Sequence, residues 1–206
     1  MKKIFTTLLA ASLMLLGTQA FAQISVNAGY LNSTVKVGNA DPSKANGGFA
    51  GVSYNVPVAG GLCVAPGLYY SMITSKSTSS LGSTLSASGI FTEHAINVPL
   101  YMNYGIEMAN DTNVFVFGGP TAQFGLSSKM KYEASAGGAS NVTRVDNYDN
   151  DNYNRFNVYL GGGIGFQISA IQITVGYDYG MINLYKGDNA PNAHRSNFKI
   201  GVGYAF

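Results

Sequence analysis

SNFKIGVGYAF, Ser196 to Phe206, is the stretch that decides the fold of this 206-residue chain. Alternate positions hold only apolar or aromatic side chains, and the positions between them hold small or polar ones. The first set is Phe198, Ile200, Val202, Tyr204 and Phe206, and the second is Asn197, Lys199, Gly201, Gly203 and Ala205. Successive side chains of a β-strand point to opposite faces, so the stretch predicts a strand with one wholly apolar face.

Seven other segments alternate in the same way. With the last one, the predicted strands are Ile24–Val37, Gly48–Val58, Leu62–Ser75, Phe91–Gly105, Asn113–Met130, Arg155–Ile168, Ile171–Leu184 and Arg195–Phe206. Each is long enough for the roughly 9–11 residues with which a tilted strand crosses a bilayer. The alternation is less clean in the fifth strand, where Phe115 and Phe117 share the parity of Thr121 and Gln123.

The connections between these strands alternate between short and long. The second, fourth and sixth links are short (Ala59–Gly61, Ile106–Thr112, Ser169–Ala170), and the others are longer and rich in Asn, Asp, Ser and Gly. This pattern is typical of transmembrane barrels, which have short periplasmic turns and long outer loops. We therefore expect an all-β fold, an eight-stranded antiparallel up-and-down transmembrane β-barrel, with both termini on the periplasmic side.

A soluble eight-stranded barrel shows the same period with its apolar side chains inside. The polar parity here carries many glycines and few charges, and only 11% of the chain is charged, against about a quarter in soluble domains. A solvated outer surface needs many Lys and Glu residues, whereas a narrow interior needs small ones. The composition therefore favours polar side chains inside and apolar ones facing lipid.

The N-terminus indicates export. Lys2 and Lys3 precede an apolar run from Ile4 to Leu16, and Ala20-Phe21-Ala22 is a small-residue cleavage site, which together predict a secretory signal peptide. The predicted organisation is a signal peptide at 1–22 and an outer-membrane β-barrel domain at 23–206. Without the two leader lysines, ten basic and ten acidic residues remain. That balance argues against a nucleic-acid partner, which needs a basic stripe.

Two further patterns resemble known outer-membrane proteins. The aromatic ending at Phe206 resembles the terminal strand by which the barrel-insertion machinery recognises its substrates, so we expect that machinery and outer-membrane lipid as partners. INVPLYMNYG (Ile96–Gly105) and NVFVFGGPTAQFGL (Asn113–Leu126) resemble the PorT-like outer-membrane β-barrel family common in Bacteroidota. The resemblance implies a location in the cell outer membrane and the barrel fold, but no chemistry.

Five charged residues have the inward parity: Glu93, Lys129, Arg155, Asp178 and Lys199. Asp178 and Lys199 are at similar depths on neighbouring antiparallel strands, so we predict that they form an ion pair in the lumen. A charge in a narrow lumen must be paired, because an isolated buried ion is very costly. A polar plug that fixes the strand register is favoured over a proton or ion path, because side chains can fill an eight-stranded barrel.

Catalytic, metal and cofactor sites are not indicated. His94 and His194 lie near the outer ends of strands, and no motif links them to Ser88, Ser196, Glu93 or Asp188. Asp146, Asp149 and Asp151 could offer oxygen ligands to calcium, but their loop lacks the glycine and terminal glutamate of an EF-hand. The lone Cys63 cannot form an intramolecular disulfide.

The sequence favours a non-enzymatic envelope protein with a structural or surface-interaction role. The alternative is a binding or transport barrel for a small apolar ligand or small solutes, and a third possibility is a lipid-modifying acyltransferase of the membrane.

Overall fold

The computed structural model describes residues 23–38, 40–81, 85–109, 111–136, 139–149, 153–186 and 191–206. The predicted signal peptide, Asp151 and Asp188 lie outside these residues. Among the residues that are described, no helix is long and apolar enough to cross a membrane. The strands are β1 (Gln23–Val37), β2 (Ser43–Ala59), β3 (Leu62–Leu81), β4 (Leu85–Ala109), β5 (Thr112–Ala136), β6 (Ala139–Asp146), β7 (Phe156–Ile168), β8 (Ile171–Gly180) and β9 (Ala193–Ala205).

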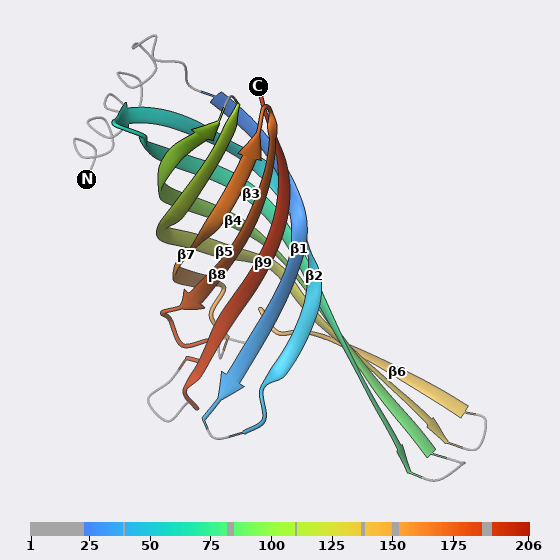
Figure 1. Ribbon diagram of the computed structural model, residues 1–206. Coiled ribbons are helices and arrows are strands. Elements are labelled where there is room, and N and C mark those ends of the chain that lie inside the picture. Colours follow the sequence, from blue (N-terminus) through green and yellow to red (C-terminus); the bar gives the residue numbers. More distant parts are fainter. Residues whose placement is uncertain are drawn as a thin grey trace.

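Eight of these strands form a closed ring (Figure 1). Their order is β4-β3-β2-β1-β9-β8-β7-β5, and antiparallel pairing of β4 with β5 closes it. The first and last strands, β1 and β9, are also antiparallel neighbours, and their paired residues run from Ser25–Ala205 to Val37–Ala193. The predicted all-β, antiparallel, eight-stranded ring is confirmed, and β6 is an additional strand that pairs only with β5 in the described chain.

Both ends of the described chain lie at one end of the ring, together with the short turns (Figure 1). Gly60 and Gly61 connect β2 to β3 with φ angles of 54° and 83°, a left-handed conformation that glycine adopts without steric cost. Ser169, between β7 and β8, and Asp111, between β4 and β5, also have positive φ angles. We call this end the short-turn end and the opposite one the outer end.

The predicted direction of the apolar face is confirmed. Along β8, Ile171, Ile173 and Val175 are exposed on the outside, whereas Gln172 and Asp178 are buried within the ring. The other strands repeat this arrangement, so that the large exposed side chains are predominantly aliphatic and aromatic and the buried set is rich in Ser, Asn and Gln. This is the inverse of a water-soluble core and suits a ring surrounded by lipid.

Beyond the ring, β3, β4, β5 and β6 continue as a four-stranded sheet that leans to one side (Figure 1). The β2–β3 pairing ends at Asn46–Thr74 and the β5–β7 pairing at Phe124–Phe156. The described residues within 75–91 and 129–146 therefore pair only among these four strands, and we call these two segments the ribbon. The sequence predicts long links there, rich in Asn, Asp, Ser and Gly. The structure instead extends β3, β4 and β5 and adds β6, so the predicted strand ends are too early.

A β-bulge in β5 corrects one predicted inward residue. Ala95 pairs with Gly125 and His94 with Ser127, so Leu126 is the extra residue. One extra residue reverses the parity of everything that follows it. Ser128 is consequently buried opposite Glu93, whereas Lys129 is exposed. The prediction that Lys129 faces the lumen is wrong for this reason.

The glycines of β7 make room for aromatic rings of β5. A Cβ atom on Gly163 would lie 2.6 Å from the Phe117 ring, and one on Gly165 would overlap the Phe115 ring. Phe115 and Phe117 therefore turn inward, which explains why the alternation of β5 is not clean. The glycine stripe accommodates neighbouring side chains in the lumen, as its inward parity predicted.

Candidate functional site

The outermost layer of the lumen is an ion pair between Glu93 on β4 and Arg195 on β9. In the ring, three strands separate β4 from β9 on either side, so the pair joins opposite walls. The guanidinium donates two hydrogen bonds to the carboxylate, with Nη2 2.8 Å from Oε2. Both side chains are almost completely buried, with 3% and 1% of their surface exposed. Arg195 Nη2 also donates to the hydroxyl of Tyr153, 3.2 Å away.

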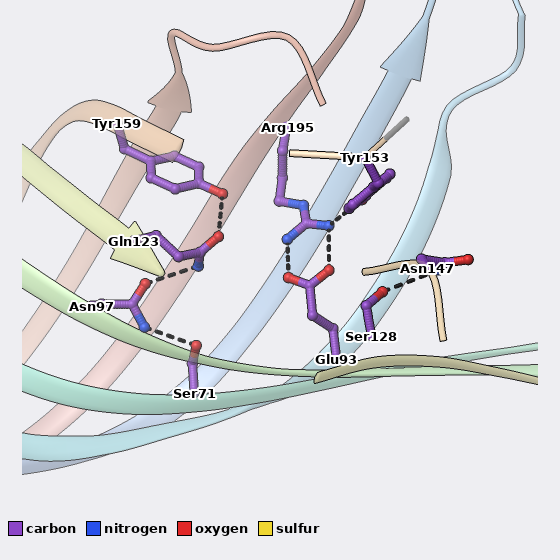
Figure 2. A network of polar contacts seen from close by, with 9 residues as sticks. All are labelled: Ser71, Glu93, Asn97, Gln123, Ser128, Asn147, Tyr153, Tyr159 and Arg195. Carbon is purple, nitrogen blue, oxygen red and sulfur yellow. Dashed lines mark hydrogen bonds and ion pairs between the residues drawn. The ribbon is translucent and has the colours of Figure 1, made fainter. Parts of the chain in front are cut away.

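A continuous line of hydrogen bonds lies beside this pair (Figure 2). Asn97 Nδ2 donates to Ser71 Oγ at 2.8 Å, Gln123 Nε2 donates to Asn97 Oδ1 at 2.8 Å, and Tyr159 OH donates to Gln123 Oε1 at 2.9 Å. These four residues, the amide chain, come from the consecutive ring strands β3, β4, β5 and β7. The amide chain follows the inner wall across these four neighbouring strands, and each interior amide is satisfied, as buried polar groups require.

A second ionic contact lies nearer the short-turn end. Lys199 Nζ is 2.5 Å from Asp178 Oδ2, and it donates to Tyr101 OH at 2.9 Å. Thr121 Oγ1 donates to the same hydroxyl at 3.1 Å. Tyr101 is on β4 and Lys199 on β9, so this contact also joins opposite walls. The structure thus places Asp178 and Lys199 together, as the strand register predicted.

Arg155 does not belong to the lumen. β7 begins after it, at Phe156, and the Arg155 side chain is 45% exposed. Its Nη2 donates to the carbonyl oxygen of Tyr148 at 2.9 Å and lies 4.0 Å from Asp149 Oδ1. The inward parity applied to a residue outside the strand, so the prediction that Arg155 faces the lumen is wrong.

Arg195 is the functional residue that the sequence analysis missed. Its parity matches that of Lys199, but it stood at the first position of the predicted strand, where parity is least certain. The actual strand begins at Ala193. Extending the inward parity of Lys199 back along the strand to Arg195 would have identified Arg195 as a partner for Glu93.

Two tyrosines from the loop between β6 and β7 cover the outer mouth. The Tyr148 and Tyr153 rings are 5.6 Å apart, and the Arg155 guanidinium lies over the Tyr148 ring at 5.3 Å. Burial raises the pKa of Tyr148 above its usual value and that of Tyr153 to about 12. Their hydroxyls therefore stay neutral at physiological pH, as donors and acceptors above Glu93 and Arg195.

Below the amide chain, the lumen contains a cavity of about 220 Å³ that extends to the short-turn end. Gln23, Gly61 and Gln167 line it at that end, and Asn97, Gln123 and Tyr159 line its outer limit. Its walls combine aromatic rings with carboxamides, and Cys63 also lines it. The Glu93–Arg195 pair and the amide chain thus place buried side chains in the outer part of the lumen, and the cavity occupies its inner part.

The residues considered for catalysis are not brought together. Glu93 faces the lumen, whereas the next residue, His94, faces outward with its Nδ1 2.5 Å from Tyr70 OH. His194 is also on the outside, where its ring stacks on Tyr179 and its Nδ1 lies 2.9 Å from the Gly180 carbonyl oxygen. Within the described ranges, neither histidine joins a serine and a carboxylate.

Of the three aspartates considered for calcium, Asp146 and Asp149 are described and have structural contacts. Asp146 Oδ1 accepts the backbone N–H of Tyr148 at 3.0 Å, which caps the turn after β6. Asp149 faces Arg155. In the part of the chain that the structure describes, no three His, Cys, Asp or Glu side chains form a group that could hold a metal ion.

Comparisons with known proteins agree with this architecture. Residues 17–186 match the family described as "Outer membrane protein beta-barrel domain". No curated protein matches the sequence. Among solved structures, the chain is similar to Ail, the attachment invasion locus protein of Yersinia pestis, solved with the heparin analogue sucrose octasulfate. That likeness has 16% identity, covers 90% of this chain and 99% of Ail, and has a TM-score of 0.51.

Two other outer-membrane structures are similar over comparable lengths. Neisserial surface protein A shares 14% identity over 89% of this chain and 97% of its own, with a TM-score of 0.48. The outer membrane enzyme PagL shares 12% identity over 88% of this chain and 98% of its own, with a TM-score of 0.43. At 16% identity, the similarity to Ail shows the fold alone. The other two similarities have TM-scores below 0.5 and support no conclusion about this chain.

Proposed function

Because this chain belongs to the outer membrane protein beta-barrel domain family, we propose that it serves the outer membrane as a non-enzymatic structural or surface-interaction protein. The observation that carries the proposal is the closure of the lumen by the Glu93–Arg195 pair and the amide chain. Buried, paired side chains at this level oppose the flow of water and ions through the ring. The parts left to act are the outer surface and the ribbon.

Ion conductance tests this proposal. Residues 23–206, reconstituted in planar bilayers, are expected to give no stable current steps, because the buried pair and the amide chain block the outer half of the lumen. A Glu93→Ala/Arg195→Ala variant removes the outermost layer and serves as the comparison. Stable current steps from the unsubstituted protein would contradict the structural role and indicate that the protein is a pore.

We propose further that residues 1–22 are a cleaved signal peptide, that both mature termini are periplasmic and that the ribbon is outside the cell. The charged leader and the long-short alternation of links support this orientation. Intact-mass measurement of the purified protein is expected to give the mass of residues 23–206. Protease added to intact cells is expected to cut the ribbon first, and protection of the ribbon would reverse the orientation.

The finer family assignment is also a proposal. The segments Ile96–Gly105 and Asn113–Leu126, which carry the resemblance to PorT-like barrels, form parts of β4 and β5 that lie within the ring. Their Gly119-Pro120 pair lies within β5, opposite Gly161 and Leu160 of β7. An origin in Bacteroidota rests on the same resemblance.

The cavity supports a second candidate function, the binding of a small, largely apolar ligand from the short-turn end. Its walls include Phe49, Tyr69, Phe115 and Phe117 beside carboxamides, a combination common in small-molecule sites. The Asn113 Oδ1 and Asn197 Oδ1 atoms are buried in these walls and have no hydrogen-bond partner within the described chain. Such acceptors suit a ligand that carries a hydroxyl or amide donor.

The single cysteine provides a test of ligand binding. Alkylation of Cys63 by iodoacetamide is expected to slow when the cavity is saturated with a small apolar alcohol, such as benzyl alcohol. The matched control carries Cys63→Ala and Ser77→Cys, which moves the thiol to an exposed position of the ribbon. Equal slowing of both thiols, or of neither, would exclude occupation of the cavity by this probe.

A further inference from the structure

Basic side chains gather on one face of the ribbon and its base. Lys76 of β3 pairs with Ile90 of β4, Ile90 with Lys131 of β5, and Lys131 with Arg144 of β6. Directly opposed residues of antiparallel strands have their side chains on the same face. Lys76, Lys131 and Arg144 therefore follow one another along a single cross-strand line.

Lys44 of β2 extends this line toward the ring. It is two residues beyond Asn46, which pairs with Thr74 of β3, and its carbonyl oxygen accepts a hydrogen bond from Ser75 Oγ at 2.8 Å. The neighbouring Ala45 is buried inside, so Lys44 faces outward. We call Lys44, Lys76, Lys131 and Arg144 the basic row.

The charges of the basic row are only partly compensated. Lys131 Nζ is 3.2 Å from Glu133 Oε1, but both side chains are more than a third exposed, and such pairs contribute little. Lys131 and Arg144 are direct cross-strand neighbours of like charge, an arrangement that destabilises a sheet. Lys44, Lys76 and Arg144 are exposed. An anion bound along the row would relieve this repulsion.

The row continues the lipid-facing surface of the ring. On β3, the outward positions before Lys76 are Leu68, Tyr70, Met72 and Thr74, so the surface changes from apolar to basic along one strand. The ribbon leans away to one side of the ring (Figure 1). The basic row lies on the face of the ribbon that continues the outward, lipid-facing surface of the ring.

We propose that the basic row binds the phosphate groups of lipid headgroups in the outer leaflet. Ammonium and guanidinium groups form strong, charge-assisted hydrogen bonds with phosphate, and basic residues at a membrane surface attract anionic headgroups. Continuity with the apolar surface favours a membrane phosphate over a soluble polyanion. The proposal rests on the outer orientation of the ribbon proposed above.

The test compares lipid retention by the mature protein in detergent, measured by native mass spectrometry. The probes are lipid A with its phosphates, dephosphorylated lipid A and a soluble heparin fragment. The row variant carries Lys44→Gln, Lys76→Gln, Lys131→Gln and Arg144→Gln. The control carries Lys186→Gln, an exposed basic residue outside the row. A difference in gel mobility between heated and unheated samples (heat modifiability) verifies that each variant is folded.

Retention of phosphorylated lipid A is expected to fall in the row variant by roughly fivefold for each charge removed, the effect of one basic residue near an anionic surface. The control and the dephosphorylated lipid should show no such fall. Equal retention by the row variant, or equal retention of both lipids, would overturn the proposal. Row-dependent binding of heparin without lipid A would assign the row to a sulfated glycan instead. Because the assay does not depend on orientation in cells, its failure is distinguishable from failure of the proposed orientation.

Discussion

At the scale of single residues, the Glu93–Arg195 pair shows how a mostly polar lumen tolerates full charges. Each charge is almost completely buried, and each has its partner on the opposite wall. A buried pair adds little net stability compared with apolar residues, but one buried charge without its partner is strongly destabilising. Replacing either Glu93 or Arg195 alone should therefore destabilise the protein more than replacing both.

Glu93→Gln is expected to reduce the free energy of unfolding by about 3–5 kcal/mol, because it leaves the Arg195 guanidinium buried without a counter-charge. Adding Arg195→Met should restore most of that loss. Glu133→Gln breaks the exposed pair with Lys131 and is the control, with an expected effect of at most about 1 kcal/mol. Urea unfolding followed by gel migration measures all three. An equal effect of Glu93→Gln and Glu133→Gln would contradict this account.

Tyr153, at the outer mouth, is expected to make the free energy of unfolding depend on pH in the alkaline range. Burial raises its pKa to about 12, above the usual tyrosine value of about 10. The folded state therefore holds the phenolic proton more tightly, and the resulting stability is present below pH ~10 and is lost as pH rises through about 12. Unfolding midpoints should fall more steeply across this interval for the unsubstituted protein than for Tyr153→Phe. Superimposable curves would contradict the prediction.

At the scale of elements, the sequence predicts a strand well where its alternation is unbroken and poorly where one residue is inserted. β9 was predicted almost to its bounds because its two faces differ at every position. Lys129 was misplaced because hydrophobicity does not reveal the bulge at Leu126. Phe115 and Phe117 face inward because the β7 glycines leave space for them, which depends on a strand remote in sequence.

The packing of β5 against β7 makes Gly165 a sensitive position. Gly165→Ala is expected to destabilise the fold by about 1–3 kcal/mol, the usual cost of overpacking, because the new Cβ overlaps the Phe115 ring. Phe115→Leu in the same chain should recover part of the loss. Gly89→Ala, whose Cβ would meet only the Tyr132 ring at 3.9 Å, is the tolerated control. Denaturant midpoints measure the series, and equal effects at both glycines would reject the packing argument.

At the scale of the whole molecule, the ring and the ribbon differ in which strands pair. Ring pairing ends at Thr74 in β3 and at Phe124 in β5, and the ribbon strands then pair only with one another. The sequence revealed the ring because a lipid-facing strand must alternate. It did not reveal the ribbon, because a sheet that lies beyond the hydrocarbon core of the membrane needs no strict alternation.

Shortening the ribbon is therefore expected to leave the ring folded. Asn-Gly would replace residues 78–88, between the paired Ser77 and Gly89, and residues 133–142, between the paired Tyr132 and Thr143, because this dipeptide forms two-residue hairpin turns. The denaturant midpoint of the shortened protein should match that of the parent. Loss of heat-modified migration would show that the ribbon is required for folding.

The pairing of Glu93 with Arg195 also bears on biogenesis. The two residues are 102 positions apart, and Arg195 arrives on the final strand. Until that strand docks, the carboxylate on β4 has no counter-charge from β9, so a nascent or truncated chain carries an uncompensated anion where the finished wall excludes water. Docking of β9 against β1 therefore also brings the Arg195 guanidinium to the Glu93 carboxylate, so that strand closure and charge compensation of this pair occur together.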